Sequence, residues 1–134
     1  MHADSVPIDV RPAVGAGQAV CSADELRPGQ MLPVLADDRD VVVIRTPDGG
    51  LHGLEDRCLH CGRRLSHGRL HVAVTATDVG RYEEEQGRFV IKCSGDGYEY
   101  DVATGTTLFD SARSVTRVAV READGAIFVG APAA

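Results

Sequence analysis

The chain of 134 residues carries 14 lysine and arginine residues against 20 aspartate and glutamate residues, a formal net charge of −6, and 43% of it is hydrophobic. This length predicts one domain with a core of its own. The acidic balance argues against nucleic acid and anionic membranes as partners, because both select basic surfaces. No apolar run approaches the roughly 18 residues of a membrane span, no secretory signal is recognisable, and four cysteines are too few for a disulfide scaffold. We therefore expect a cytoplasmic protein with neither a nucleic-acid nor a membrane partner.

The first part of the chain is rich in glycine, proline and small residues, which predicts a flexible N-terminal arm over residues 1–17. The folded domain is expected to occupy residues 18–131. Ser22-Ala-Asp-Glu25 is a capping-box pattern and predicts a short helical turn, which Pro28-Gly29 ends.

Strand patterns dominate the remainder of the chain. The expected strands are Val41–Ile44, Leu51–Leu54, Phe89–Ile91, Tyr98–Tyr100, Val115–Arg121 and Ala126–Val129. Many short strands with turn residues about every eight to twelve positions predict an all-β sandwich or barrel. The stretch from residue 72 to residue 88 holds the acidic run Glu83–Glu85 and is expected to be an exposed loop or hairpin.

Two short segments carry most of the chemistry. Cys58-Leu-His60-Cys61-Gly62 and Cys93-Ser-Gly-Asp96-Gly97 each follow an expected strand and run into glycine. If the two loops meet, they present thiolates and an imidazole at one point, which is how proteins chelate iron or zinc.

These segments resemble the metal loops of Rieske-type ferredoxin domains. The resemblance rests on the run from Leu54 to His60, on Leu65-Ser-His-Gly-Arg-Leu70 and on the run from Cys93 to Gly105, and it covers most of residues 18–130. It implies an all-β, Rieske-like antiparallel β sandwich with two metal-binding loops at one tip. It also implies a [2Fe–2S] cluster held by two cysteines on one iron and two histidines on the other. The spacer between the loops is longer than usual for the family, so we expect an insertion at residues 71–88.

By this resemblance Cys58 and Cys93 are the thiolate ligands and His60 is the first histidine ligand. The second loop departs from the family pattern, because Asp96 stands where the second histidine is expected. A carboxylate there would bind as an anionic oxygen and add one negative charge at the cluster. We therefore expect the ligand set Cys58, His60, Cys93 and Asp96, with a reduction potential below the usual Rieske range.

Cys61 leaves three interpretations open. It is an alternative fourth ligand, which would give three cysteines and one histidine. It also makes a C-x-x-C pair with Cys58, so that Cys58, Cys61 and Cys93 together with Asp96 could hold one zinc ion, although zinc sites normally finish with histidine or cysteine. A third interpretation is a small apolar side chain packed beneath the loop.

The functional expectation is an electron-transfer protein that is not an enzyme on its own. By resemblance, it would dock on a reductase and then on a terminal oxygenase or another redox enzyme. The alternative is a degenerate Rieske fold, either free of a cluster or bound to zinc, that serves as a structural or assembly subunit like the small subunit of nitrite reductase.

Overall fold

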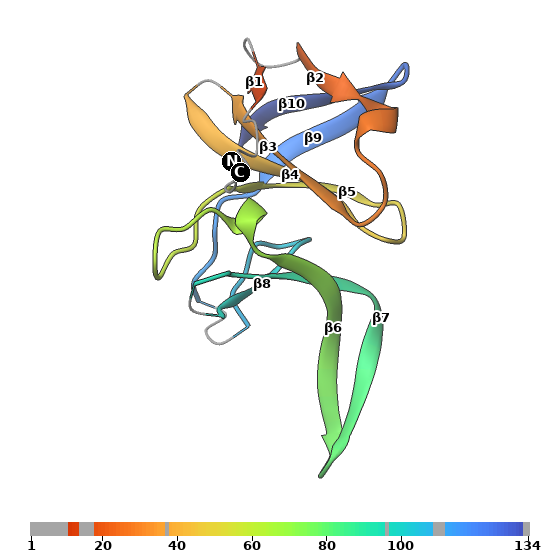
Figure 1. Cartoon of the computed structure of the whole chain (residues 1–134), viewed down its shortest axis with the longest axis vertical. Helices are drawn as coiled ribbons and strands as arrows, with labels where there is room; N and C mark the ends of the chain where they lie inside the picture. The colour runs from red at the N-terminus through yellow and green to blue at the C-terminus, as the bar shows by residue number, and fades with distance from the viewer. Residues whose placement is uncertain (1–10, 14–17, 37, 96, 109–111, 133–134) are drawn as a thin grey trace, which may run out of the picture.

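Strands in three sheets are the main secondary structure of the chain, a computed structural model that describes residues 11–13, 18–36, 38–95, 97–108 and 112–132 (Figure 1). In these ranges the helical segments are two 3-10 turns, η1 (Ala23–Glu25) and η2 (Leu65–His67). The all-β fold class expected from the sequence is confirmed. No helix in the described ranges is long and apolar enough to cross a membrane.

The first sheet has the strand order β1-β3-β4-β5, the second β2-β10-β9 and the third β6-β7-β8. All pairs are antiparallel except β1 with β3, which is parallel. The strands are β1 (Arg11–Ala13), β2 (Gln18–Ser22), β3 (Gln30–Ala36), β4 (Arg39–Arg45), β5 (Leu51–Glu55), β6 (Arg69–Asp78), β7 (Arg81–Lys92), β8 (Glu99–Asp101), β9 (Val118–Ala123) and β10 (Ala126–Pro132).

Strand β4 separates two hydrophobic cores. Its residues Val41–Ile44 are at most 1% exposed, and alternate side chains point to opposite faces of the sheet. Val41 and Val43 pack into an upper core with side chains from β2, β3, β9 and β10. Val42 and Ile44 pack into a lower core that contains Cys58 and Cys93. The continuous apolar run therefore reflects burial on both faces, and it fixes the cysteine loops against the sheet.

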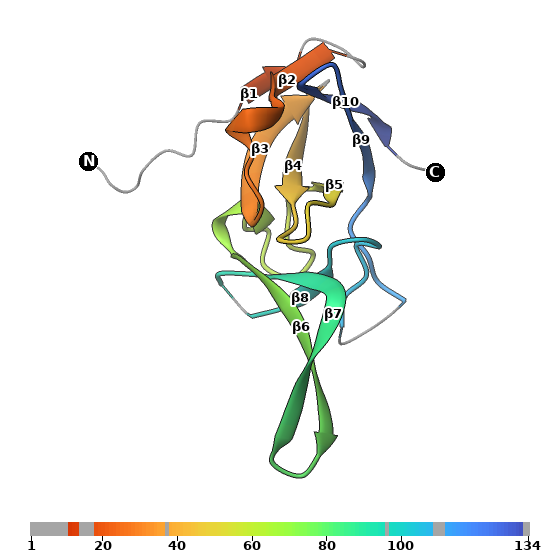
Figure 2. The same cartoon turned by 90° about the vertical axis from the view of Figure 1, so that its right-hand side faces the viewer.

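The long hairpin of β6 and β7 projects away from both cores (Figures 1 and 2). Val79 at its tip is 98% exposed and Tyr82 is 71% exposed. An exposed hairpin was one of the two forms expected for the stretch 72–88, and the hairpin is the form observed. That residues 71–88 are an insertion relative to the family stays a prediction.

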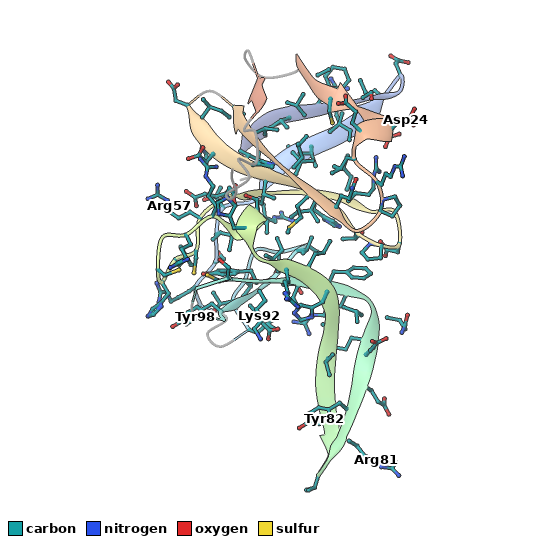
Figure 3. All side chains as sticks on the ribbon, viewed as in Figure 1. Asp24, Arg57, Arg81, Tyr82, Lys92 and Tyr98 are labelled. Carbon is teal, nitrogen blue, oxygen red and sulfur yellow. The ribbon has the colours of Figure 1, made fainter. Side chains whose placement is uncertain are left out.

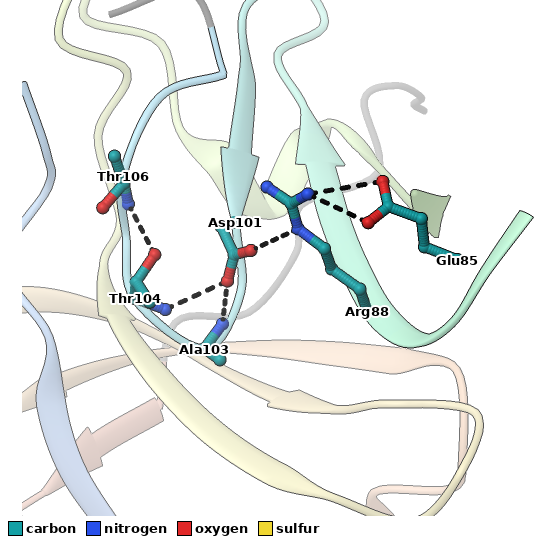
Figure 4. Close-up of polar contacts among 6 residues, drawn as sticks. All are labelled: Glu85, Arg88, Asp101, Ala103, Thr104 and Thr106. Carbon is teal, nitrogen blue, oxygen red and sulfur yellow. Dashed lines mark hydrogen bonds and ion pairs between the residues drawn. The ribbon is translucent and has the colours of Figure 1, made fainter. Parts of the chain in front are cut away.

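A buried carboxylate joins the base of the hairpin to the turn after β8 (Figure 4). Asp101 is 8% exposed. Its Oδ1 atom accepts hydrogen bonds from the backbone N–H groups of Ala103 at 2.9 Å and Thr104 at 3.1 Å. Its Oδ2 atom accepts one from Arg88 Nε at 2.8 Å, and Arg88 also pairs with Glu85. These contacts hold β8, and with it the end of the second cysteine loop, against β7.

Two predictions concern the N-terminal part of the chain, a helical turn and a flexible arm. The helical turn expected at residues 22–25 is present as η1, with the Ser22 backbone N–H donating to Glu25 Oε1 at 2.9 Å. Within the segment predicted as an arm, Arg11–Ala13 belongs to the first sheet as β1. The arm stays a prediction for residues 1–10 and 14–17, which lie outside the described residues.

Candidate metal centre

The two cysteine loops share one backbone design. In the first loop, the Cys58 N–H donates to Arg63 O at 2.8 Å and the Gly62 N–H donates to Cys58 O at 3.0 Å. In the second, the Cys93 N–H donates to Tyr98 O at 2.8 Å and the Gly97 N–H donates to Cys93 O at 3.2 Å. The spacing from cysteine to partner is the same in both loops.

Glycine is required at the matching position of each loop. Gly62 has φ +77° and Gly97 has φ +78°, in the left-handed region that side chains with a Cβ adopt at a cost. The glycines that end both motifs therefore let each loop turn back on its own cysteine. The spacing of cysteine and glycine in the sequence reflects this loop geometry.

The loops bring three thiols together. The Sγ atoms of Cys58, Cys61 and Cys93 all lie within 4.8 Å of one another, and those of Cys61 and Cys93 are 3.4 Å apart. Cys58 is 1% exposed and Cys93 is 3% exposed, whereas Cys61 lies at the surface. None of the four cysteines forms a disulfide, and Cys21 lies apart from the group, in the upper core.

Hydrogen-bond donors surround the two buried sulfur atoms. The Tyr100 hydroxyl lies 3.2 Å from Cys58 Sγ and accepts the Leu59 N–H at 2.8 Å. The Gly95 N–H donates to Cys93 Sγ at 3.4 Å. Burial alone would raise the pKa of the Cys58 thiol, but hydrogen bonds from Tyr100 and from the backbone amides of Cys61 and His60 outweigh it and lower that pKa. The environment thus favours the thiolate, the form that binds metals.

A buried carboxylate holds the base of the first loop. Asp56, which is 2% exposed, accepts the Ser66 backbone N–H at 2.8 Å and the Ser66 hydroxyl at 2.7 Å. Arg64 lies 3.4 Å from the same carboxylate. Because Asp56 precedes the loop and Ser66 follows it, these bonds join the two ends of the loop.

The remaining candidate residues take different places. The His60 ring is exposed and stacks on the Tyr98 ring, with centroids 4.7 Å apart and an interplanar angle of 11°. The described residues that group closely enough to share one metal ion are the three cysteines, without His60. Asp96 lies outside the described residues. Figure 3 labels Tyr98 beside the loops, far from Tyr82 on the hairpin.

Two residues of the site were missed by the sequence analysis. Tyr100 was expected only as a strand residue, yet it is fully buried and contacts Cys58. Asp56 lies in the run from Leu54 to His60 that carries the family resemblance, but no role was predicted for it. Nothing local in the sequence distinguishes these two from an ordinary strand tyrosine and a surface aspartate, since their contacts join residues far apart in the chain.

Comparisons with known proteins agree with this geometry. Three solved structures each match 84% of this chain. A putative NADH-dependent nitrite reductase small subunit from Mycobacterium tuberculosis is 24% identical over 91% of that chain, with a TM-score of 0.68. The ferredoxin of carbazole 1,9a-dioxygenase from Nocardioides aromaticivorans IC177 is 23% identical over 95% of that chain, with a TM-score of 0.65.

The third structure is the complex of reduced oxygenase and oxidized ferredoxin in carbazole 1,9a-dioxygenase, with 21% identity over 90% of the matched chain and a TM-score of 0.63. At these identities the likeness shows the fold alone. No curated protein matches the sequence. The profile of the Rieske [2Fe-2S] domain matches residues 16–115, most of the chain. The protein therefore belongs to the Rieske [2Fe-2S] domain family.

Proposed function

We propose that the chain is an electron-transfer protein that carries a [2Fe–2S] cluster between its two cysteine loops. The observation that carries the proposal is the shared backbone design of the loops, which brings the buried thiols of Cys58 and Cys93 together. When bound, the cluster supplies one-electron oxidation and reduction.

The residues present fit such a group on the thiolate side. Cys58 and Cys93 each receive N–H or O–H donors at sulfur, and hydrogen bonds to ligand sulfur stabilise added negative charge. His60 belongs to the same loop and, by the family resemblance, would be a ligand of the second iron; its exposed ring stacks on that of Tyr98. Asp96, proposed from the sequence, completes the set of ligands.

The chain's own residues give the site its character as a carrier. Asp56 and Tyr100 hold the first loop in place by accepting the backbone N–H groups of Ser66 and Leu59. The exposed ring of His60 presents the outer face of the site to a docking protein. We propose a reductase and a terminal oxygenase or other redox enzyme as partners, with the cytoplasm as the compartment. The ferredoxin–oxygenase complex among the structural neighbours supports this kind of partner.

The test is anaerobic purification and reconstitution of the full chain, with counts of iron and acid-labile sulfide and a visible absorption spectrum. We expect two of each per chain and a brown protein. Asp96→Ala should lower cluster content, and Asp96→His should move the spectrum toward an ordinary Rieske centre. Cys21→Ala is the control, because that thiol lies in the other core. A chain that binds neither iron nor sulfide after reconstitution would overturn the proposal.

A second candidate is a structural or assembly subunit without a cluster. The fold likeness to a nitrite reductase small subunit favours it, as does the position of the His60 ring outside the thiol group. The same counts separate the two candidates, because this second function requires no iron or sulfide.

A further inference from the structure

Cys61 has no counterpart in the expected set of Cys58, His60, Cys93 and Asp96, yet the fold places it with the two buried thiols. Its Sγ atom lies 3.4 Å from that of Cys93 and within 4.8 Å of that of Cys58. Gly95 across the gap has no side chain, and a Cβ atom there would lie 3.3 Å from Cys61 Sγ and 2.7 Å from Arg63 Cδ. The lack of a side chain at Gly95 is therefore what admits Cys61 and Arg63 at this edge of the site.

We propose that Cys58, Cys61 and Cys93 form a three-thiolate site for one soft divalent cation of the Zn²⁺ class, which occupies the loops when the cluster does not. The geometry suits a single ion. Zinc–sulfur bonds are about 2.3 Å long, so two thiolates on one ion lie at most about 4.6 Å apart and close to 3.8 Å in a tetrahedral site. Cys61 Sγ and Cys93 Sγ are 3.4 Å apart and all three sulfur atoms lie within 4.8 Å of one another, so the group is close to the size of a single-ion site.

A two-iron cluster spreads its ligands over two metal atoms, so it does not call for three sulfur atoms within reach of one ion. The two occupants share Cys58 and Cys93 and therefore exclude one another. The single ion leaves its fourth position to water or another donor, and it braces the loops without redox chemistry. This inference is independent of the proposed function, since metal binding by the cluster-free chain needs neither iron nor sulfide.

Cobalt titration of the reduced, cluster-free full chain tests the proposal. The titration is anaerobic and uses a phosphine reductant, because Cys61 and Cys93 are close enough to oxidise to a disulfide. Thiolate-to-cobalt charge-transfer absorption in the near ultraviolet scales with the number of thiolate ligands, and visible d–d bands report tetrahedral geometry. Displacement of Co²⁺ by Zn²⁺ then gives the zinc affinity.

The deciding variant is Cys61→Ser, with Cys21→Ala as the matched loss of a thiol outside the group. Because Cys61 is exposed, its replacement leaves the cores intact, and circular dichroism checks the fold. We expect Cys61→Ser to lose about one third of the charge-transfer intensity and to bind Zn²⁺ at least about a hundredfold more weakly, because loss of a direct ligand should cost no less than the roughly 10–100-fold that loss of a ligand's hydrogen-bond partner costs. Cys21→Ala should match the unchanged protein.

Full intensity and affinity in Cys61→Ser would overturn the proposal, and so would a wild-type chain without thiolate charge transfer. Reconstitution with iron and sulfide separates this failure from failure of the proposed function. If the chain builds the cluster but Cys61→Ser binds cobalt as the unchanged protein does, only the three-thiolate site is refuted. A chain that binds cobalt through three thiolates but builds no cluster refutes only the electron-transfer proposal.

Discussion

The Tyr100 hydroxyl is the clearest single atom by which to test how the first loop is held. Tyr100→Phe keeps the buried ring and removes only the oxygen that accepts the Leu59 N–H at 2.8 Å and lies 3.2 Å from Cys58 Sγ. The ring itself is fully buried in the lower core. The substitution therefore removes the polar contacts of the hydroxyl without opening a cavity.

The expected cost is worked from the contacts of this hydroxyl with Leu59 and Cys58. The Leu59 N–H loses its partner in a partly buried place, and an unsatisfied buried donor costs about 1–3 kcal/mol. Sulfur is a weak acceptor, so the contact with Cys58 adds about 0.5 kcal/mol. We expect a loss of about 2 kcal/mol in the free energy of unfolding. At an unfolding entropy of about 2.1 cal/mol/K per residue, this lowers Tm by about 7 °C.

Urea unfolding of the reduced, cluster-free chain measures this loss, with thermal unfolding as a second reading. Tyr82→Phe is the matched control, because Tyr82 is 71% exposed on the hairpin and its hydroxyl faces water. It should lie within about 0.5 kcal/mol of the unchanged protein. If Tyr100→Phe proves as stable as Tyr82→Phe, the hydroxyl does not hold the loop and our account of the site's support is wrong.

Three further predictions concern the surroundings of the site. Asp101→Ala removes two backbone acceptor contacts and the partner of Arg88, so we expect about 2–3 kcal/mol less stability by urea unfolding, against about 1 kcal/mol for Arg88→Ala, whose side chain is 43% exposed. Burial lowers the pKa of His52 although Asp48 and Asp101 oppose the shift. Protonation therefore opposes folding, and stability should be full above about pH 6.5 and fall as pH drops below it. His52→Gln should flatten that dependence between pH 7 and pH 5, and an unchanged slope would exclude His52 as its source. Replacing residues 75–83 of the hairpin by Asn-Gly should leave the free energy of unfolding within about 1 kcal/mol of that of the unchanged protein, because this segment projects away from both cores. The metal content should also be unchanged. A large loss of stability or of metal would show that the hairpin tip supports the site.

Local patterns predicted much of the fold. The capping box, the buried run Val41–Ile44 and the glycine turns act through neighbouring residues, and the structure has the corresponding elements. The strand β3 (Gln30–Ala36) was not predicted, and Pro33 at its centre is one reason, since proline lowers strand propensity. Pairing with β4 along its whole length outweighs that propensity.

The candidate site also has one part that the sequence predicted and one part that it did not. The cysteine–glycine spacing of both loops is local and was visible in the sequence. That Cys61 belongs with Cys58 and Cys93 was left open, because it depends on how two loops separated in the chain approach each other. The support from Asp56 and Tyr100 depends on contacts over 10 and 42 residues of sequence, respectively. One sequence carries no local mark of such contacts.

The division of the interior by β4 has a consequence for how metal binding and folding are linked. Cys58 and Cys93 are members of the lower core, whereas the upper core contains none of the three grouped thiols. Any ion or cluster that binds the folded loops more tightly than the unfolded chain adds its binding energy to the stability of the folded state. That energy acts first on the lower core, because the residues that bind the metal belong to that core.

Amide hydrogen exchange should therefore slow on metal binding chiefly in the cysteine loops, β7 and β8, while β2, β9 and β10 change only with global stability. Equal protection of both cores would mean that the two halves unfold as one unit, and that β4 couples them instead of separating them.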